Sequence, residues 1–194
     1  MNTKSPNLSI FPVVIQHINN FITEDECLRI IEKCKTLDLQ KHQVLKNNAV
    51  SSYKISGANV LNNFPHLQEI IFEKVVCYEN ELGLFNSKID NSWVNFQYKD
   101  SGVKKHQHPG AQISGVLYLK SDEKSSKIYF YNPNPYNSFI RKRVLNHNNF
   151  EHVSFCPKIG DLILFPSWLN HGSHDDENLS EERIALSFNT KSVI

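Results

Sequence analysis

The sequence predicts a mainly β protein with flanking helices, in which the N-terminal helices pack on one sheet of a jelly-roll-like core. Two observations support this fold class. From residue 91 onward, short runs rich in β-branched and aromatic residues follow one another with no useful helical pattern between them. Before residue 90, two segments instead repeat apolar residues at the spacing of amphipathic helices.

The N-terminal part carries the helix signals. In TEDECLRIIEKCKTL, Thr23 and Glu26 have capping-box spacing, and the apolar residues that follow recur at helical spacing. In FPHLQEIIFEKVVCYENELG, a proline stands near the first turn and Gly83 stands where a helix would end. The run LSIFPVVIQHI, which precedes both segments, predicts a short strand.

Six strands are predicted in the second part of the chain. The runs are SWVNFQYK, AQISGVLYLK, SKIYFY, HVSFC, DLILF and RIALSFN. Turns rich in Gly, Pro, Asn and Asp separate them, at 99–102, 132–135 and 159–161. Many short strands without intervening helices are typical of an antiparallel sandwich or barrel.

We expect residues 1–194 to form a single domain. In this division, 1–90 supply an N-terminal strand and supporting helices, and 91–190 form the β core. Within the core, 132–157 are polar, hold three prolines and carry the basic group at 141–143. We expect this stretch to be a long loop or hairpin over one end of the core, serving as a lid or binding loop.

The amino-acid composition indicates which classes of binding partner to expect. The chain is 40% hydrophobic and 21% charged with a net charge of +1, which is ordinary for a globular protein and gives no indication of nucleic-acid or membrane binding. No apolar run reaches the length of a bilayer span. The four cysteines show no CxxC pairing, which favours reduced thiols and a cytoplasmic location. We therefore expect a small-molecule or peptide substrate, and the sequence carries no signal for an oligomeric state.

Two histidines one residue apart stand just before the apolar run SGVLYL. On an extended segment, His106 and His108 would point to the same side. A third imidazole from a distant strand would complete a three-cornered metal site with open positions for chemistry. His171, in FPSWLNH, is the candidate, and His174 is a rival of opposite strand parity. The alternative is that the pair are ordinary solvated histidines.

The last predicted strand places an arginine and a serine on one face. Arg183 and Ser187 share this face by the period of two. A buried guanidinium without a partner is costly, and a bound carboxylate would satisfy both side chains. Arg183 could instead pair outside the barrel with Glu181 or Glu182. Tyr118 could add a hydrogen bond to the same carboxylate, or could be part of the core.

Together these motifs resemble those of the 2-oxoglutarate- and iron(II)-dependent oxygenases. The sequence is most similar to a bacterial and phage group with H-x-H-P, SGVxYL, FPSWLxH and RxxxSFN stretches, and Trp93 and Asn95 fit as well. The resemblance covers most of the chain. It implies a double-stranded β-helix of the cupin-like kind, an iron(II) centre, 2-oxoglutarate as co-substrate and O₂ as oxidant.

Carried over by position, the resemblance implies a role for each candidate residue. The metal ligands, and hence the catalytic centre, would be His106, His108 and His171. Arg183 would bind the distal carboxylate of 2-oxoglutarate. The other residues at the co-substrate would be Tyr118, Ser187 and Asn95.

One position departs from the wider superfamily. The usual motif is His-x-Asp or His-x-Glu with a distant His, and His108 occupies the carboxylate position. Three neutral imidazoles leave iron(II) with its full double charge, which the 2-oxoglutarate dianion could neutralise. The change predicts weaker iron retention in the apo enzyme, and could favour zinc or copper.

The leading functional hypothesis is oxidative hydroxylation of a peptidyl residue such as proline, or of a small molecule. A second hypothesis is a non-catalytic, cupin-like module that binds a metal or another ligand. A third is a three-histidine metal oxygenase that does not use 2-oxoglutarate, such as a thiol dioxygenase. The third hypothesis leaves Arg183 and Ser187 without a role.

Overall fold

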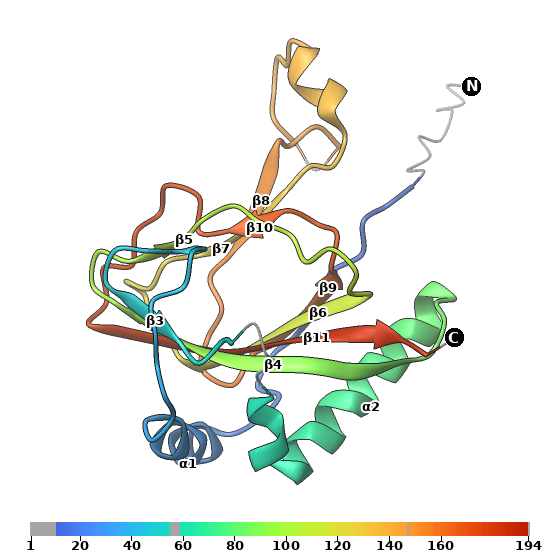
Figure 1. Cartoon of the computed structure of the whole chain (residues 1–194). Helices are drawn as coiled ribbons and strands as arrows, with labels where there is room; N and C mark the ends of the chain where they lie inside the picture. The colour runs from blue at the N-terminus through green and yellow to red at the C-terminus, as the bar shows by residue number, and fades with distance from the viewer. Residues whose placement is uncertain (1–10, 55–58, 147, 194) are drawn as a thin grey trace.

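Two antiparallel sheets face each other, and two helices cover the outer side of the larger sheet (Figure 1). This computed structural model describes residues 11–54, 59–146 and 148–193. The helices are α1 (Glu24–Cys34) and α2 (Pro65–Leu82), with the 3-10 turns η1 (Val60–Asn63) and η2 (Pro135–Phe139). The strands are β1 (Gln16–Ile18), β2 (Leu45–Lys46), β3 (Ala49–Ser51), β4 (Ser87–Tyr98), β5 (Gly102–Val103), β6 (Ile113–Lys120), β7 (Ile128–Tyr131), β8 (His152–Phe155), β9 (Leu162–Pro166), β10 (His171–Gly172) and β11 (Glu182–Ser192).

The helix boundaries follow the predicted local signals. The Thr23 hydroxyl accepts the Glu26 backbone N–H at 3.3 Å, and the Glu26 carboxylate accepts the Thr23 N–H at 2.8 Å, so α1 begins at a capping box. Helix α2 begins at Pro65 and ends at Gly83, whose φ of 64° is left-handed and therefore suits glycine. Neither these helices nor any other in the described ranges is both long and apolar enough to cross a membrane.

The larger sheet has the strand order β1-β9-β6-β11-β4-β3. Its central strand, β11, pairs with β4 on one side and β6 on the other. Ile184, Leu186 and Phe188 face the helices and are fully buried in one core cluster. The alternate residues of β11 face the interior of the barrel instead, as the predicted period of two requires. The larger sheet thus separates an apolar helix-covered layer from a cavity.

The smaller sheet has the order β10-β7-β8, and β2 pairs with β5 beside it. All six predicted strands of the second part are present, and the short β2, β3, β5 and β10 are additional to the prediction. Strand β1 lies within the predicted 8–18 segment, of which residues 8–10 lie outside the described residues. A cavity of about 1320 Å³ opens between the two sheets.

A projecting arm of residues 132–151 connects β7 to β8 (Figure 1). Its amides fold it onto itself: Asn137 Nδ2 donates to the Asn149 and Phe150 carbonyls at 3.2 and 3.1 Å. Large apolar side chains, such as Phe139 at 80% exposure, face solvent. We expected the 132–157 stretch to be a lid or binding loop, but none of its described residues is among those that line the cavity. The stretch does form the loop of a hairpin between β7 and β8, and its role as a lid or binding loop stays a prediction.

Candidate metal centre

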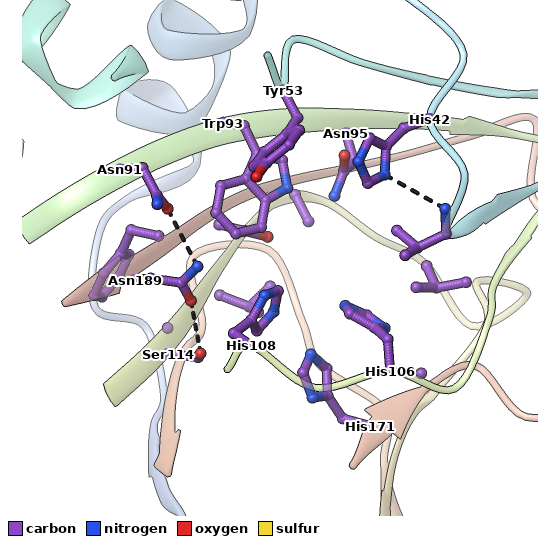
Figure 2. A pocket seen from close by; sticks show the side chains of 18 of the residues that line it. His42, Tyr53, Asn91, Trp93, Asn95, His106, His108, Ser114, His171 and Asn189 are labelled. Atoms are coloured by element: carbon purple, nitrogen blue, oxygen red, sulfur yellow. Dashed lines mark hydrogen bonds between the residues drawn. The ribbon is translucent and has the colours of Figure 1, made fainter. Parts of the chain in front are cut away.

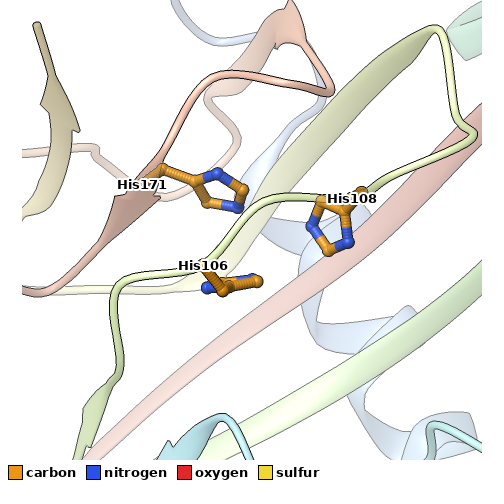
Figure 3. Close-up of side chains that lie close together, drawn as sticks. All are labelled: His106, His108 and His171. Carbon is orange, nitrogen blue, oxygen red and sulfur yellow. The ribbon is translucent and has the colours of Figure 1, made fainter. Parts of the chain in front are cut away.

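Three imidazoles converge at one wall of the cavity (Figure 3). The ligand nitrogens of His106, His108 and His171 all lie within 4.8 Å of one another. The ring centroids are 4.3 Å apart for His106 and His171, and 4.9 Å apart for His106 and His108. No aspartate or glutamate of the described residues joins this group. The cluster therefore offers three nitrogen donors and no carboxylate to a metal ion.

Backbone pairing positions the cluster. The His106 N–H donates to the His171 carbonyl at 2.9 Å, and the His171 N–H donates back to the His106 carbonyl at 2.9 Å. The N–H of His108 donates to the Ser167 carbonyl at 2.9 Å. These bonds hold the segment between β5 and β6 against the segment that carries β10. Residues far apart in the sequence thus present their side chains at one place.

A glycine permits this close approach. A Cβ atom added at Gly172 would lie 2.8 Å from the Val103 carbonyl oxygen and 2.9 Å from that of Lys104. Both contacts are with backbone atoms, which cannot move aside without separating the two segments. The residue after His171 must therefore be small for the histidines to meet.

The hydrogen bonds of two rings leave the same nitrogen free. His106 Nδ1 lies 2.8 Å from the Lys104 carbonyl oxygen, and His171 Nδ1 lies 2.8 Å from that of Leu169. Because a carbonyl only accepts, each Nδ1 carries the proton and donates. Each Nε2 then has a free lone pair, which is the form of imidazole that binds metals.

Burial favours the neutral form of all three imidazoles. Burial, followed by the neighbouring His106 ring, lowers the pKa of His108 to about 4. Burial also lowers the pKa of His106, and that of His171 well below its usual value. Neutral imidazoles do not repel a cation and keep their lone pairs for coordination.

The Arg183 guanidinium lies in the same cavity, and no carboxylate of the described residues pairs with it. Arg183 is 5% exposed, and one of its terminal nitrogens donates to Gln97 Oε1. Its Nε has no hydrogen-bond partner within the described residues, and neither has Gln97 Nε2. Because buried donors without acceptors are costly in a protein interior, these atoms could hydrogen-bond to an anionic ligand.

Tyr118 completes this polar end of the cavity. The Arg183 guanidinium carbon lies 5.0 Å from the centre of the Tyr118 ring. The phenol is fully buried, and its oxygen is another atom without a partner in the described chain; burial raises its pKa, so the phenol carries its proton. Ser187 and Asn95 line the same cavity. All the predicted co-substrate residues therefore reach one space.

Aromatic side chains lie beside the cluster, next to His108 (Figure 2). Trp93 lies against His108 with ring centroids 5.6 Å apart, and Tyr53 meets Trp93 edge to face at 5.3 Å. Beyond them, a chain of neutral groups crosses the cavity floor: the Ser114 hydroxyl donates to Asn189 Oδ1 at 2.7 Å, and Asn189 Nδ2 donates to Asn91 Oδ1 at 3.2 Å. This part of the lining offers aromatic rings and amides, with Lys54, Asp90 and Lys191 also among the lining residues.

The rival positions lie elsewhere. His174 packs on the outer side of the smaller sheet, stacked with Tyr131 at 5.8 Å. Its Nδ1 accepts the Asp175 N–H at 2.7 Å. Glu182 pairs with Lys120 at 2.8 Å rather than with Arg183. The structure thus places His174 and Glu182 away from the cluster and from Arg183, while Tyr118 is also part of a buried core cluster, as the other interpretation of this residue expected.

Gln97 is a site residue that the sequence analysis missed. It lies directly opposite Arg183 in the β4–β11 pairing, on the same strand face as Trp93 and Asn95. The period of two, continued from Asn95, would have found it. Its partner is visible only once the register of the two strands is known.

Comparison with known proteins gives one family. Residues 91–189 match the sequence model of the family described as "Putative 2OG-Fe(II) oxygenase". No curated protein matches the chain.

The fold is similar to that of several solved structures. A prolyl-4-hydroxylase from Pseudomonas putida has a TM-score of 0.67 and 12% identity, with 94% of each chain covered. A prolyl hydroxylase from Trichoplax adhaerens, in complex with a hypoxia inducible factor oxygen degradation domain peptide fragment, has a TM-score of 0.66 and 13% identity, covering 92% of this chain and 83% of that chain. HygX from Streptomyces hygroscopicus, with nickel, 2-oxoglutarate and hygromycin B bound, has a TM-score of 0.65 and 12% identity, covering 94% and 84%. At these identities the likeness establishes the fold, the predicted double-stranded β-helix.

Proposed function

Because this chain belongs to the 2OG-Fe(II) oxygenase family, we propose that it hydroxylates a carbon of a peptidyl residue, such as proline, or of a small molecule. One observation carries the proposal. The three imidazoles and the unpaired end of Arg183 line the same cavity. A metal ion and a dicarboxylate would therefore be held side by side, as the family's chemistry requires.

The residues of this chain fit both groups. His106 and His171 each keep Nε2 free for iron(II), since Nδ1 is occupied by a backbone carbonyl. His108 supplies the third nitrogen. The buried atoms without partners, Arg183 Nε and the Tyr118 hydroxyl, suit the distal carboxylate of 2-oxoglutarate.

When bound, iron(II) and 2-oxoglutarate supply an oxidant from O₂, with release of succinate and CO₂. The chain's own residues would bind these two groups and hold them in a fixed orientation. Gln97 accepts from the Arg183 guanidinium and so fixes the orientation of its remaining donors. The Tyr118 hydroxyl, which has no partner among the described residues, would donate a hydrogen bond to the bound co-substrate, and Ser187 and Asn95 line the same cavity.

The aromatic side of the cavity would receive the substrate. Tyr53 and Trp93 stand beside His108, and they would exclude water from the carbon that reacts. The amides of Asn91 and Asn189 could hydrogen-bond to a peptide group or to hydroxyls. The similar folds of enzymes named as prolyl hydroxylases, and of HygX with hygromycin B, agree with either substrate class.

An anaerobic titration tests the proposal. 2-Oxoglutarate is added to the iron(II)-loaded protein while the weak visible metal-to-ligand charge-transfer band is recorded. We expect a saturable band in the wild-type protein and none in a His171→Ala variant. After air is admitted, succinate should form.

Each other outcome contradicts the proposal in its own way. Metal binding with neither a band nor succinate would support the non-catalytic binding module. Oxygen uptake without dependence on 2-oxoglutarate would support a three-histidine oxygenase of another kind.

A further inference from the structure

The tip of the projecting arm is an apolar surface that faces solvent (Figure 1). It is formed by η2 and by the segment that follows η2. Its large apolar side chains have exposed fractions between 61% and 80%. These side chains are Tyr136, Phe139, Ile140, Val144 and Leu145. Exposed apolar side chains that are gathered on one segment, rather than scattered singly, are typical of an interaction surface.

The arm is also positively charged. Lys142 pairs with Glu151 at 2.8 Å, and Glu151 is the only acidic residue between 132 and 151. Arg141 and Arg143 are exposed, and neither forms an ion pair with another described residue. A partner that covers the apolar tip should therefore carry carboxylates, because complementary charges favour association.

A second exposed surface lies at the root of the same arm. The arm leaves the smaller sheet after Tyr131 and returns to it at His152. On the outer side of that sheet, the His174 ring packs against these two rings at centroid distances of 5.8 and 4.9 Å, and against Tyr129 at 5.3 Å. We call these four rings the outer ring cluster. Lys105 Nζ lies 4.3 Å from the centre of the Tyr131 ring, so the cluster already accepts one cation.

The loop beside the outer ring cluster is acidic. Residues 173–182 contain five aspartates and glutamates and no lysine or arginine. The side chain of Asp175 is 91% exposed, and Glu177 and Leu179 are exposed as well. Carboxylates, aromatic rings and an exposed leucine are the chemistry that a basic, apolar arm would contact.

We propose that the arm of one copy of this chain docks on the outer ring cluster and the acidic loop of a second copy. The inference is independent of the proposed function. A second copy is favoured as the occupant because one chain carries both complementary surfaces, and because the ring cluster lies at the root of the arm. Within one copy, Arg141 and Arg143 form no ion pair with the acidic loop. About a two-fold axis each arm would reach the other copy, so the same contact would form twice and the dimer would be closed.

Sedimentation velocity of the full-length protein, over a series of micromolar concentrations, tests the proposal. We expect a concentration-dependent dimer for the wild-type protein. Phe139→Asp should weaken the dimer at least about 100-fold, because aromatic anchors carry much of the binding energy of an interface and each substitution is present twice. Phe85→Asp is the matched control and should leave the dimer unchanged. Phe85 is 76% exposed, in the connection between α2 and β4.

Charge reversal identifies the surface on which the arm docks. Arg141→Glu combined with Arg143→Glu should weaken the dimer, since the arm would then meet a loop of like charge. Asp175→Lys combined with Glu177→Lys should weaken it for the same reason. The protein with all four substitutions should regain most of the affinity, because the attraction returns with its signs exchanged. Circular dichroism checks that each variant is folded.

The other outcomes contradict the proposal. A wild-type protein that stays monomeric over the whole series would overturn it. If this monomer bound vesicles of phosphatidylglycerol and Phe139→Asp did not, the arm would instead be assigned to an anionic membrane surface. Equal dimer affinities of Phe139→Asp and Phe85→Asp would remove the arm from the interface. If the fourfold variant dimerised no more tightly than the two charge-reversed variants, the acidic loop would not be the docking surface.

Discussion

His106 and His171 are hydrogen-bonded to each other through their backbones, each donating its N–H to the other's carbonyl at 2.9 Å. The two residues belong to segments that are distant in the sequence and form an isolated antiparallel bridge. Their imidazoles consequently project from the bridge side by side, with ring centroids 4.3 Å apart. The proposed metal centre therefore depends on the approach of two backbones as much as on the identity of its side chains.

Replacement of the glycine beside this bridge should damage the metal centre. In Gly172→Ala the new methyl group would lie within 3 Å of two backbone oxygens, so the segments must separate. We expect at least about a tenfold loss of metal affinity, as for removal of an interaction worth about 1.4 kcal/mol. Gly83→Ala is the control, because its φ of 64° makes alanine costly at the end of α2 without a contact near the cluster. Both variants should melt at a lower temperature than the wild-type protein. Equal metal affinities of the Gly172→Ala and Gly83→Ala variants would contradict the argument.

Substitution of the two histidines in the FPSWLNHGSH segment should have very different effects on metal binding. His171→Ala removes a buried nitrogen of the cluster, whereas His174→Ala changes a ring stacked on Tyr131 outside it. We expect His171→Ala to lose stoichiometric metal binding and His174→Ala to keep it. Metal content after dialysis distinguishes the two variants. Retention of metal by His171→Ala would exclude His171 as a ligand.

The affinity for 2-oxoglutarate should depend on the guanidinium of Arg183 in β11. Charge-assisted hydrogen bonds contribute about 1.5–3 kcal/mol each, so Arg183→Leu should weaken 2-oxoglutarate binding by at least about 100-fold. The matched control is Glu182→Gln, which alters the neighbouring residue that pairs with Lys120. Calorimetry on the metal-loaded proteins measures both affinities, and circular dichroism checks the fold. Unchanged affinity in Arg183→Leu would remove this arginine from the site.

The stability of the metal-free protein should depend on pH. Burial lowers the pKa of His108 to about 4, compared with about 6.5 in an unfolded chain. Between these values the unfolded chain binds more protons, so the free energy of unfolding should fall as the pH falls through this window. The slope is up to about 1.4 kcal/mol per pH unit for each such imidazole. Urea denaturation at a series of pH values should show a shallower slope for His108→Asn; identical slopes would argue against a neutral, buried His108.

The arm should be dispensable for the metal centre. Its described residues make their hydrogen bonds within the arm, as Asn137 does with Asn149, and they do not line the cavity. Replacing residues 135–148 by a short Gly-Ser turn should therefore leave metal and 2-oxoglutarate affinities within about twofold of the wild-type values, since surface changes rarely exceed 0.5 kcal/mol. A large loss of 2-oxoglutarate affinity in this variant would support the role as a lid that the sequence predicts for the arm.

Local patterns in the sequence predicted much of the fold. The capping box at Thr23 and the glycine at position 83 mark helix ends because they satisfy backbone groups within one turn. The alternation along β11 assigned Arg183 and Ser187 to one face because successive strand side chains point to opposite sides. The HxH spacing likewise indicated two imidazoles on one side.

The tertiary structure decided what local patterns leave open. The separation of His171 from His174 depends on the bridge to His106, and the assignment of Gln97 to Arg183 depends on the register of β4 against β11. The residues that line the cavity come from several separate segments of the chain. The sequence alone specifies which side chains share one face of a single strand. Only the pairing and packing of distant strands determine which of those side chains meet across a cavity, because hydrogen-bond register and backbone approach are properties of two segments rather than one.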